Sequence, residues 1–111
     1  MSEALAQVLG SIAASWGSDR KLSEEELESL LDSYRALRNG CAGSPEYQTA
    51  CSANASLLDD SLKIMKNLLN YEDDETSALC VRVATQFLGN LIVNHSDNQL
   101  LVWDKFSPLL K

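Results

Sequence analysis

The sequence predicts an all-α protein, an α-solenoid fragment of about six helices. Three observations lead to this prediction. Leu, Ala, Glu and Ser dominate the 111 residues, with only five Gly and two Pro, which favours helix over sheet. Apolar residues recur at helical spacing through most of the chain. A segment in the first half also recurs near the end, as expected of a repeat array.

The internal repeat pairs ALRNGCAGSPEYQ, residues 36–48, with FLGNLIVNHSDNQ, residues 87–99, without a gap. The matched pairs share a constant offset of 51 residues, and they are Leu37 with Leu88, Asn39 with Asn90, Glu46 with Asp97 and Gln48 with Gln99. Both copies combine the end of an apolar helix, a short turn and the start of another helix. We therefore expect the two copies to be equivalent parts of successive helical units.

The leading helices are predicted over residues 2–41. One apolar stripe of the first helix is formed by Leu5, Val8, Leu9, Ile12 and Trp16, and WGSDRK then ends the helix. The second helix begins with a capping box in which the Ser23 hydroxyl and the Glu26 carboxylate each accept from the other residue's backbone amide. It runs to about Cys41, where Gly40, Gly43 and Pro45 favour a turn.

One three-helix repeat is predicted over residues 45–94. It consists of a short helix over 45–53, a medium helix capped by Asn54 or Ser56, and a long helix over about 76–94. Asp59 and Asp60 are expected in the first turn of the medium helix. The long helix carries the widest apolar belt, so we expect it to be the most buried.

The start of the next repeat is predicted over residues 97–111. Ser96 with Gln99 is expected to cap a helix that ends near Phe106, and Ser107 with Pro108 to start another. A short helix followed by two longer ones is the unit of an armadillo repeat, and about 40–47 residues is usual for armadillo and HEAT units. The longer offset is attributed to the connections at Asn54 and Glu72.

Composition restricts the class of protein. We expect one domain over residues 1–111 that is a fragment or terminal piece of a longer repeat protein, and the family resemblance described below implies that it is the N-terminal part. A net charge of −7, with nine scattered basic residues, argues against nucleic-acid binding. The chain lacks a long apolar run and a signal peptide, and its cysteines, Cys41, Cys51 and Cys80, suit buried free thiols. A cytoplasmic protein without membrane insertion is predicted.

The segment FLGNLIVNHSDNQLLVWDKFSPLL, together with ALRNGCAGSPEYQ, resembles the N-terminal armadillo-like region of the ataxin-10 family. The similarity covers roughly residues 34–110, and the later segment is the more specific. It implies a non-enzymatic cytoplasmic scaffold with roles in neuronal survival, neurite growth and cytokinesis. It also implies O-GlcNAc transferase as a protein partner, and self-association.

A polar strip is the first candidate protein-binding site. Residues four apart share a helix face, and the strip combines Arg35, Asn39, Arg82, Gln86 and Asn90. In armadillo arrays the last helix of each unit lines a concave groove, where Asn can hydrogen-bond a peptide backbone. The alternative is that Asn39 and Asn90 brace neighbouring helices, as most buried amides do.

A second hypothesis is an N-terminal capping and self-association module. Its candidate contact is an apolar edge formed by Trp103, Phe106, Leu109 and Leu110. Substitutions at either site distinguish the two hypotheses, because loss of partner binding and loss of self-association are separate measurements.

Enzymatic chemistry is not expected. His95 is the single histidine, at a helix end where it is expected to bond the last carbonyls, and the cysteines lack zinc-ligand spacing. The adjacent carboxylates of Asp59 and Asp60, and of Asp73 and Asp74, fall at predicted helix starts. We therefore predict no catalytic residue, metal site or cofactor.

Overall fold

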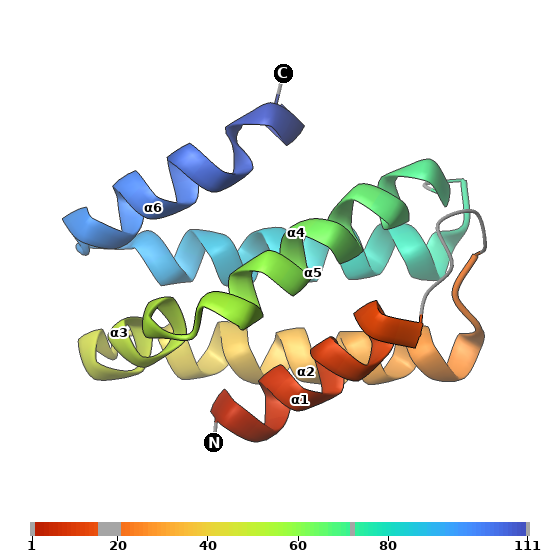
Figure 1. Cartoon of the computed structure of the whole chain (residues 1–111), viewed down its shortest axis with the longest axis horizontal. Coiled ribbons are helices and arrows are strands. Elements are labelled where there is room, and N and C mark those ends of the chain that lie inside the picture. Colours follow the sequence, from red (N-terminus) through yellow and green to blue (C-terminus); the bar gives the residue numbers. More distant parts are fainter. Residues whose placement is uncertain (1, 16–20, 72, 111) are drawn as a thin grey trace.

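Each of the first three helices packs against the helix that follows three places later in the chain (Figure 1). The structure is a computed structural model that describes residues 2–15, 21–71 and 73–110. Within these residues the elements are α1 (Ser2–Ser15), α2 (Glu24–Cys41), α3 (Pro45–Ala53), α4 (Ala55–Leu68), the 3-10 helix η1 (Leu69–Tyr71), α5 (Glu75–Ile92), α6 (Ser96–Phe106) and the 3-10 helix η2 (Ser107–Leu110). The all-α prediction is confirmed for this part of the chain.

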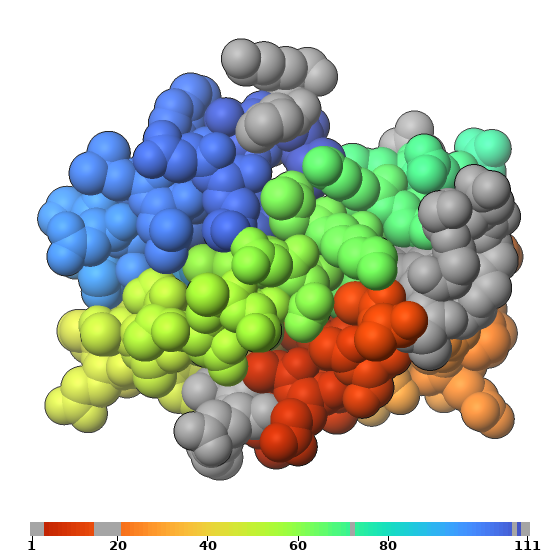
Figure 2. Space-filling view, viewed as in Figure 1, coloured from red at the N-terminus to blue at the C-terminus, as the bar shows by residue number. Residues whose placement is uncertain are grey.

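The helices form two layers. The long helices α2 and α5 lie side by side, while α1 and α4 pack together in front of them in Figure 1. The short helix α3 contacts α6 at one end. Figure 2 shows the front face, where α4 lies between α1 and α6. The molecule measures 35 × 31 × 22 Å.

The core lies between the two layers. The rings of Tyr34 and Phe87, from α2 and α5, have centroids 5.9 Å apart and a tilted geometry. The Tyr34 hydroxyl donates a 2.8 Å hydrogen bond to the Ser61 hydroxyl of α4. Burial raises the pKa of Tyr34 because the phenolate would lose its hydration there. One aromatic residue therefore joins three helices.

Helix starts follow the local sequence at most positions. Ser23 and Glu26 form the expected capping box, and Asn54 caps α4 by accepting from the Leu57 amide at 3.2 Å. Asp59 and Asp60 lie in the second turn of α4 rather than its first, because the helix begins immediately after Asn54. The Trp16 position of the first predicted stripe falls outside the described residues.

The start of α6 differs from the prediction. His95, not Ser96, is the N-cap, and its Nδ1 accepts from the Asn98 amide at 3.2 Å. Its Nε2 lies 3.0 Å from the Thr49 hydroxyl of α3. The Gln99 side chain donates instead to the Ile92 carbonyl at 3.0 Å. An imidazole nitrogen can accept like a hydroxyl, so the ring takes the cap and links α3 to α6.

Candidate functional site

The turns that follow α2 and α5 have the same backbone form. Ala42 has φ −65° and ψ 110°, and Val93 has φ −62° and ψ 122°. Gly43 and Asn94 come next with positive φ values of 70° and 54°. Glycine and asparagine are the residues that best tolerate this left-handed conformation. The two turns therefore meet the same backbone requirement with different residues.

The helix boundaries repeat with the same offset. α2 begins at Glu24 and α5 at Glu75, and the short helices that follow begin at Pro45 and Ser96, so each pair is 51 residues apart. The N-caps repeat as well, with Ser23 and Asp74 each accepting from the third residue of its helix. The sequence alignment thus coincides with equivalent helix ends, although only a minority of its positions match.

Two buried amides join the second turn to α3. The Gln48 side chain donates to the carbonyls of Asn90, at 2.8 Å, and Val93, at 2.9 Å. The Asn98 side chain donates to the carbonyls of Gln48, at 3.2 Å, and Leu91, at 3.0 Å. Carbonyls at the end of a helix lack partners within the helix, so these bonds stabilise the end of α5.

The structure places four residues of the predicted polar strip on the surface and the fifth, Asn90, partly inside the fold. Arg35 and Asn39 on α2, and Arg82 and Gln86 on α5, are exposed. Since α2 and α5 lie side by side, the strip spans two adjacent helices. Asn90 is half-buried, and its side chain donates to the Arg38 carbonyl at 2.9 Å. Asn90 therefore braces the end of α2, as the alternative interpretation expected.

Arg38 is a member of this face that sequence reasoning missed. Its Nη1 donates to the Gln86 side-chain oxygen at 2.8 Å, and its Nε donates to the Asn39 side-chain oxygen at 3.1 Å. It thereby orients polar groups from both helices. In the sequence, Arg38 directly precedes Asn39. A stripe drawn along a single helix omits Arg38, whereas a face formed by two adjacent helices includes it. We call Arg35, Arg38, Asn39, Arg82 and Gln86 the α2–α5 polar face.

The predicted apolar edge is only partly exposed. Trp103 is 60% exposed, and Leu100, one turn earlier on α6, is 67% exposed. Phe106 is 2% exposed and belongs to the core cluster, so it is not part of the exposed surface. Leu109 is partly buried against the core, and the side chain of Leu110 falls outside the described residues. Among the described side chains of the predicted edge, Trp103 is therefore the exposed one, and Leu100, which was not part of the prediction, is exposed with it.

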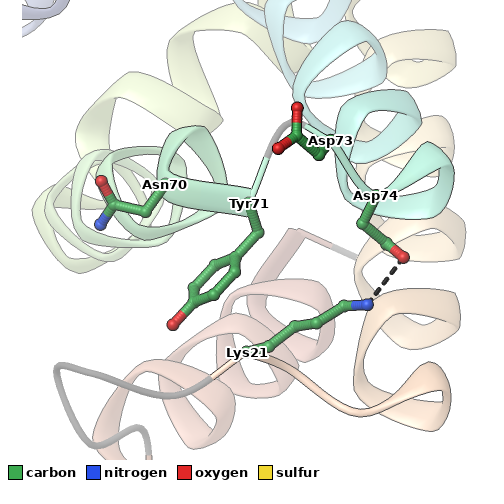
Figure 3. Close-up of a pocket in the computed structure, with 5 residues that line it drawn as sticks. All are labelled: Lys21, Asn70, Tyr71, Asp73 and Asp74. Atoms are coloured by element: carbon green, nitrogen blue, oxygen red, sulfur yellow. Dashed lines mark hydrogen bonds and ion pairs between the residues drawn. The ribbon is translucent and has the colours of Figure 1, made fainter.

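An ion pair connects Lys21, which precedes α2, to Asp74 at the start of α5. The Lys21 ammonium donates to the Asp74 carboxylate at 2.7 Å, and Asp74 also accepts from the Ser77 amide at 2.9 Å (Figure 3). The hydrogen bond from Lys21, followed by that from Ser77, lowers the pKa of Asp74 to about 2. These bonds complete the cap of α5.

The hollow beside this ion pair is open and polar, with a volume of about 370 Å³. It is lined by Lys21, Asn70, Tyr71, Asp73 and Asp74, and Figure 3 shows Asn70 pointing away from the ion pair. Two of its charged groups, Lys21 and Asp74, are paired with each other at the cap of α5.

Within the described residues, no three His, Cys, Asp or Glu side chains come together as ligands for a metal ion. The helices of the same residues are all too short or too polar to cross a lipid bilayer. Comparison of the chain with protein-family models, curated proteins and solved structures finds no match.

Proposed function

We propose that this chain is part of a non-enzymatic protein-binding scaffold built from armadillo- or HEAT-like units. The observation that carries the proposal is the 51-residue repetition of helix starts, caps and left-handed turns, combined with the packing of each leading helix on the helix three places later. A structural unit that repeats in both local conformation and neighbours is the basis of a solenoid. The resemblance to the ataxin-10 family supports the same assignment.

The side of α2 that faces away from α5, and the side of α5 that faces away from α2, differ in composition. This difference supports a proposal for which end of the array is the terminal one. Against α2, α5 uses Cys80, whose thiol donates to the Leu27 carbonyl, and Phe87, which packs on Tyr34. The residues 51 positions earlier, on α2, are Ser29 and Ala36, and both are exposed. The outer side of α2 thus lacks the groups that α5 uses for packing. A polar outer side is what the terminal unit of a repeat array requires.

The outer side of α5 has a different character. The positions 51 residues after Leu30, Leu37 and Cys41, which α2 buries, are Val81, Leu88 and Ile92. These three apolar side chains are partly exposed. They are suited to contact a further helical unit in the way that α2 contacts α5. We therefore assign α1 and α2 to the capping end of the array and α5 and α6 to the end that continues it.

The α2–α5 polar face is the proposed partner-binding surface. Three of the four arginines in an acidic chain, Arg35, Arg38 and Arg82, lie on its two helices. Arginine and amide side chains supply several hydrogen-bond donors, which suits recognition of backbone carbonyls and carboxylates on another protein. Asn90 is left out of the proposed surface because its side-chain amide donates to the Arg38 carbonyl within the fold.

The experiment is a binding measurement with purified O-GlcNAc transferase, the partner that the family resemblance implies. The double variant Arg35→Ala and Arg82→Ala removes two exposed charges and should weaken binding at least tenfold. Lys66→Ala, an exposed cation on α4, is the matched control and should bind as the parent chain does. Equal binding by all three proteins would reject this face as the partner surface. The family roles in neuronal survival, neurite growth and cytokinesis would be tested with the same variants in cells.

Self-association through α6 is the second candidate function. It is favoured by the exposure of Leu100 and Trp103 on one face of α6, since neighbouring large apolar residues on a surface often mark a contact site. Sedimentation of the parent chain should show a species heavier than the monomer that Trp103→Ser and Leu100→Ser remove. A parent chain that remains monomeric at every concentration would contradict this function.

A further inference from the structure

Two thiols lie close together at the junction of α2 and α3. Cys41 is the last residue of α2, and Cys51 lies in the last turn of α3. Their sulfur atoms are 4.0 Å apart, and both residues are fully buried. A disulfide bond needs a sulfur separation of about 2 Å, which small rotations of the two side chains can supply. The two sulfur atoms are therefore near enough for a bond between these residues to be considered.

The two thiols differ in acidity. Cys41 donates its S–H hydrogen to the Cys51 sulfur, and this hydrogen bond lowers the pKa of Cys51. The same hydrogen bond, with burial, raises the pKa of Cys41. Because the thiolate is the nucleophilic form of cysteine, Cys51 is the residue suited to react first and Cys41 is suited to resolve the product.

Tyr47 lies beside this site. A Cβ atom added at Gly40 would overlap the Tyr47 ring, so the ring lies directly on the α2 backbone beside Cys41. Burial, and then the nearby Cys51 and Cys41 thiols, raise the pKa of Tyr47. The residue is itself only half-buried. Movement of this one ring, or opening of the short helix α3, would connect the thiols to solvent.

We propose that Cys41 and Cys51 are a redox-active dithiol that a hydroperoxide converts to an intramolecular disulfide. With hydrogen peroxide as the oxidant, the Cys51 thiolate attacks one peroxide oxygen and breaks the O–O bond. The products are a Cys51 sulfenic acid and a hydroxide ion, which takes up one proton and becomes water. The Cys41 sulfur then attacks the Cys51 sulfur, loses its proton and displaces the hydroxyl as a second water. The two thiols lose two electrons in total, and the peroxide gains them.

The disulfide would have a structural consequence. It would tie α3 to the end of α2, while Gln48 of α3 already bonds the end of α5. Oxidation would therefore hold the junction of α2, α3 and α5 by one covalent and two hydrogen-bonded links. Cys80 provides an internal comparison, because it is also buried but donates to the Leu27 carbonyl at 3.4 Å and has no sulfur partner.

The experiment treats the folded full chain with hydrogen peroxide and maps its peptides by mass spectrometry. Trypsin leaves Cys41 and Cys51 in one peptide, residues 39–63, and Cys80 in another, residues 67–82. The first peptide should become lighter by two hydrogen atoms, at least tenfold faster than Cys80 is modified. Further cleavage after Glu46, which separates Cys41 from Cys51 in the chain, should leave two fragments that come apart only on reduction.

Variants distinguish a built site from general oxidation. Cys80→Ser should retain the disulfide, whereas Cys51→Ala should lose it and leave Cys41 as slow to react as Cys80. Tyr47→Ala should speed the reaction, and Tyr47→Phe, which keeps the ring, should not. Circular dichroism establishes that each variant is folded. Over-oxidation of Cys51 without a link, or a link that forms only in denaturant, would overturn the proposal.

Discussion

The segments 24–53 and 75–106 share their helix starts and the turn between their helices, but not their buried faces. Helix starts, N-caps and left-handed turn residues match at an offset of 51 residues. Burial follows a different offset, because six of the seven buried positions of α2 become buried positions of α5 when shifted by 50 residues. One residue in a helix corresponds to a rotation of about 100°. The two helices therefore have the same length, but the buried face of one is rotated about the helix axis relative to the buried face of the other.

This rotation follows from the neighbours of each helix. α2 packs against α1 and α5, whereas α5 packs against α2 and α4, so they cover different sides. Turn chemistry depends on the backbone of a few residues, and it repeats wherever the same turn is needed. Burial depends on which neighbours are present, and it changes between one unit and the next. The comparison teaches that a repeat can be recognised from its turns while its packing remains specific to position.

The largest effect is expected at Phe87. Phe87→Ala should lower the free energy of unfolding by about 3–5 kcal/mol, because the ring is fully buried against Tyr34. Leu88→Ala, at the next residue on the partly exposed side of α5, should cost clearly less. Urea denaturation of both variants measures the difference. Equal losses would show that α5 is not rotated as described.

The aligned glutamines provide a second comparison. Gln48 is buried and bonds two carbonyls at the end of α5, so Gln48→Ala should cost about 1–3 kcal/mol. Gln99 is exposed and bonds one, so Gln99→Ala should cost no more than about 1 kcal/mol. Thermal unfolding of the pair tests whether identical aligned residues have unequal roles. The reverse order would contradict the assignment.

The helical glycines should respond in opposite directions. Gly89→Ala meets no atom within 4 Å and should stabilise the chain by about 0.5–1 kcal/mol through helix propensity. Gly40→Ala would displace the Tyr47 ring and should destabilise it by about 1 kcal/mol net. Denaturation midpoints give both signs. A stabilising Gly40→Ala would show that the ring moves freely.

The smallest effect is expected at the cap of α5 and depends on pH. The pKa of Asp74 is lowered from 3.8 to about 2. The ionised carboxylate therefore stabilises the fold above pH 3.8, and this stabilisation is lost as the pH falls from 3.8 toward about 2. Asp74→Asn should remove this part of the acid dependence. Thermal melts from pH 2 to pH 5 measure it, with Asp97→Asn as the exposed control on α6. Parallel curves for parent and Asp74→Asn would contradict the ion-pair assignment.

The sequence was sufficient to predict all six helices and most of their ends. Apolar periodicity and residues such as Ser23, Asn54 and Gly43 act locally, so their effect can be read without knowledge of the fold. The cap at His95 was missed because an imidazole accepts only when its tautomer and its neighbour Thr49 allow it. That information lies in a helix far away in the sequence.

The candidate sites were harder to predict for the same reason. Helical spacing placed Asn90 on one stripe with Gln86 but could not show that its amide is used by the Arg38 carbonyl of another helix. It also placed Trp103 and Phe106 on one edge, although only Trp103 is exposed. The proximity of Cys41 and Cys51 depends on the turn between α2 and α3, and no spacing rule for cysteines reveals it.

The pairing of α2 with α5 has a consequence for synthesis of the chain on the ribosome. The principal partner of α2 lies some 50 residues later in the sequence, so the side of α2 that packs against α5 stays uncovered until α5 has emerged. Contacts between distant residues form slowly because a long loop must first close. During this interval the nascent chain would leave Tyr34, the partner of Phe87, open to chaperones or to other nascent chains.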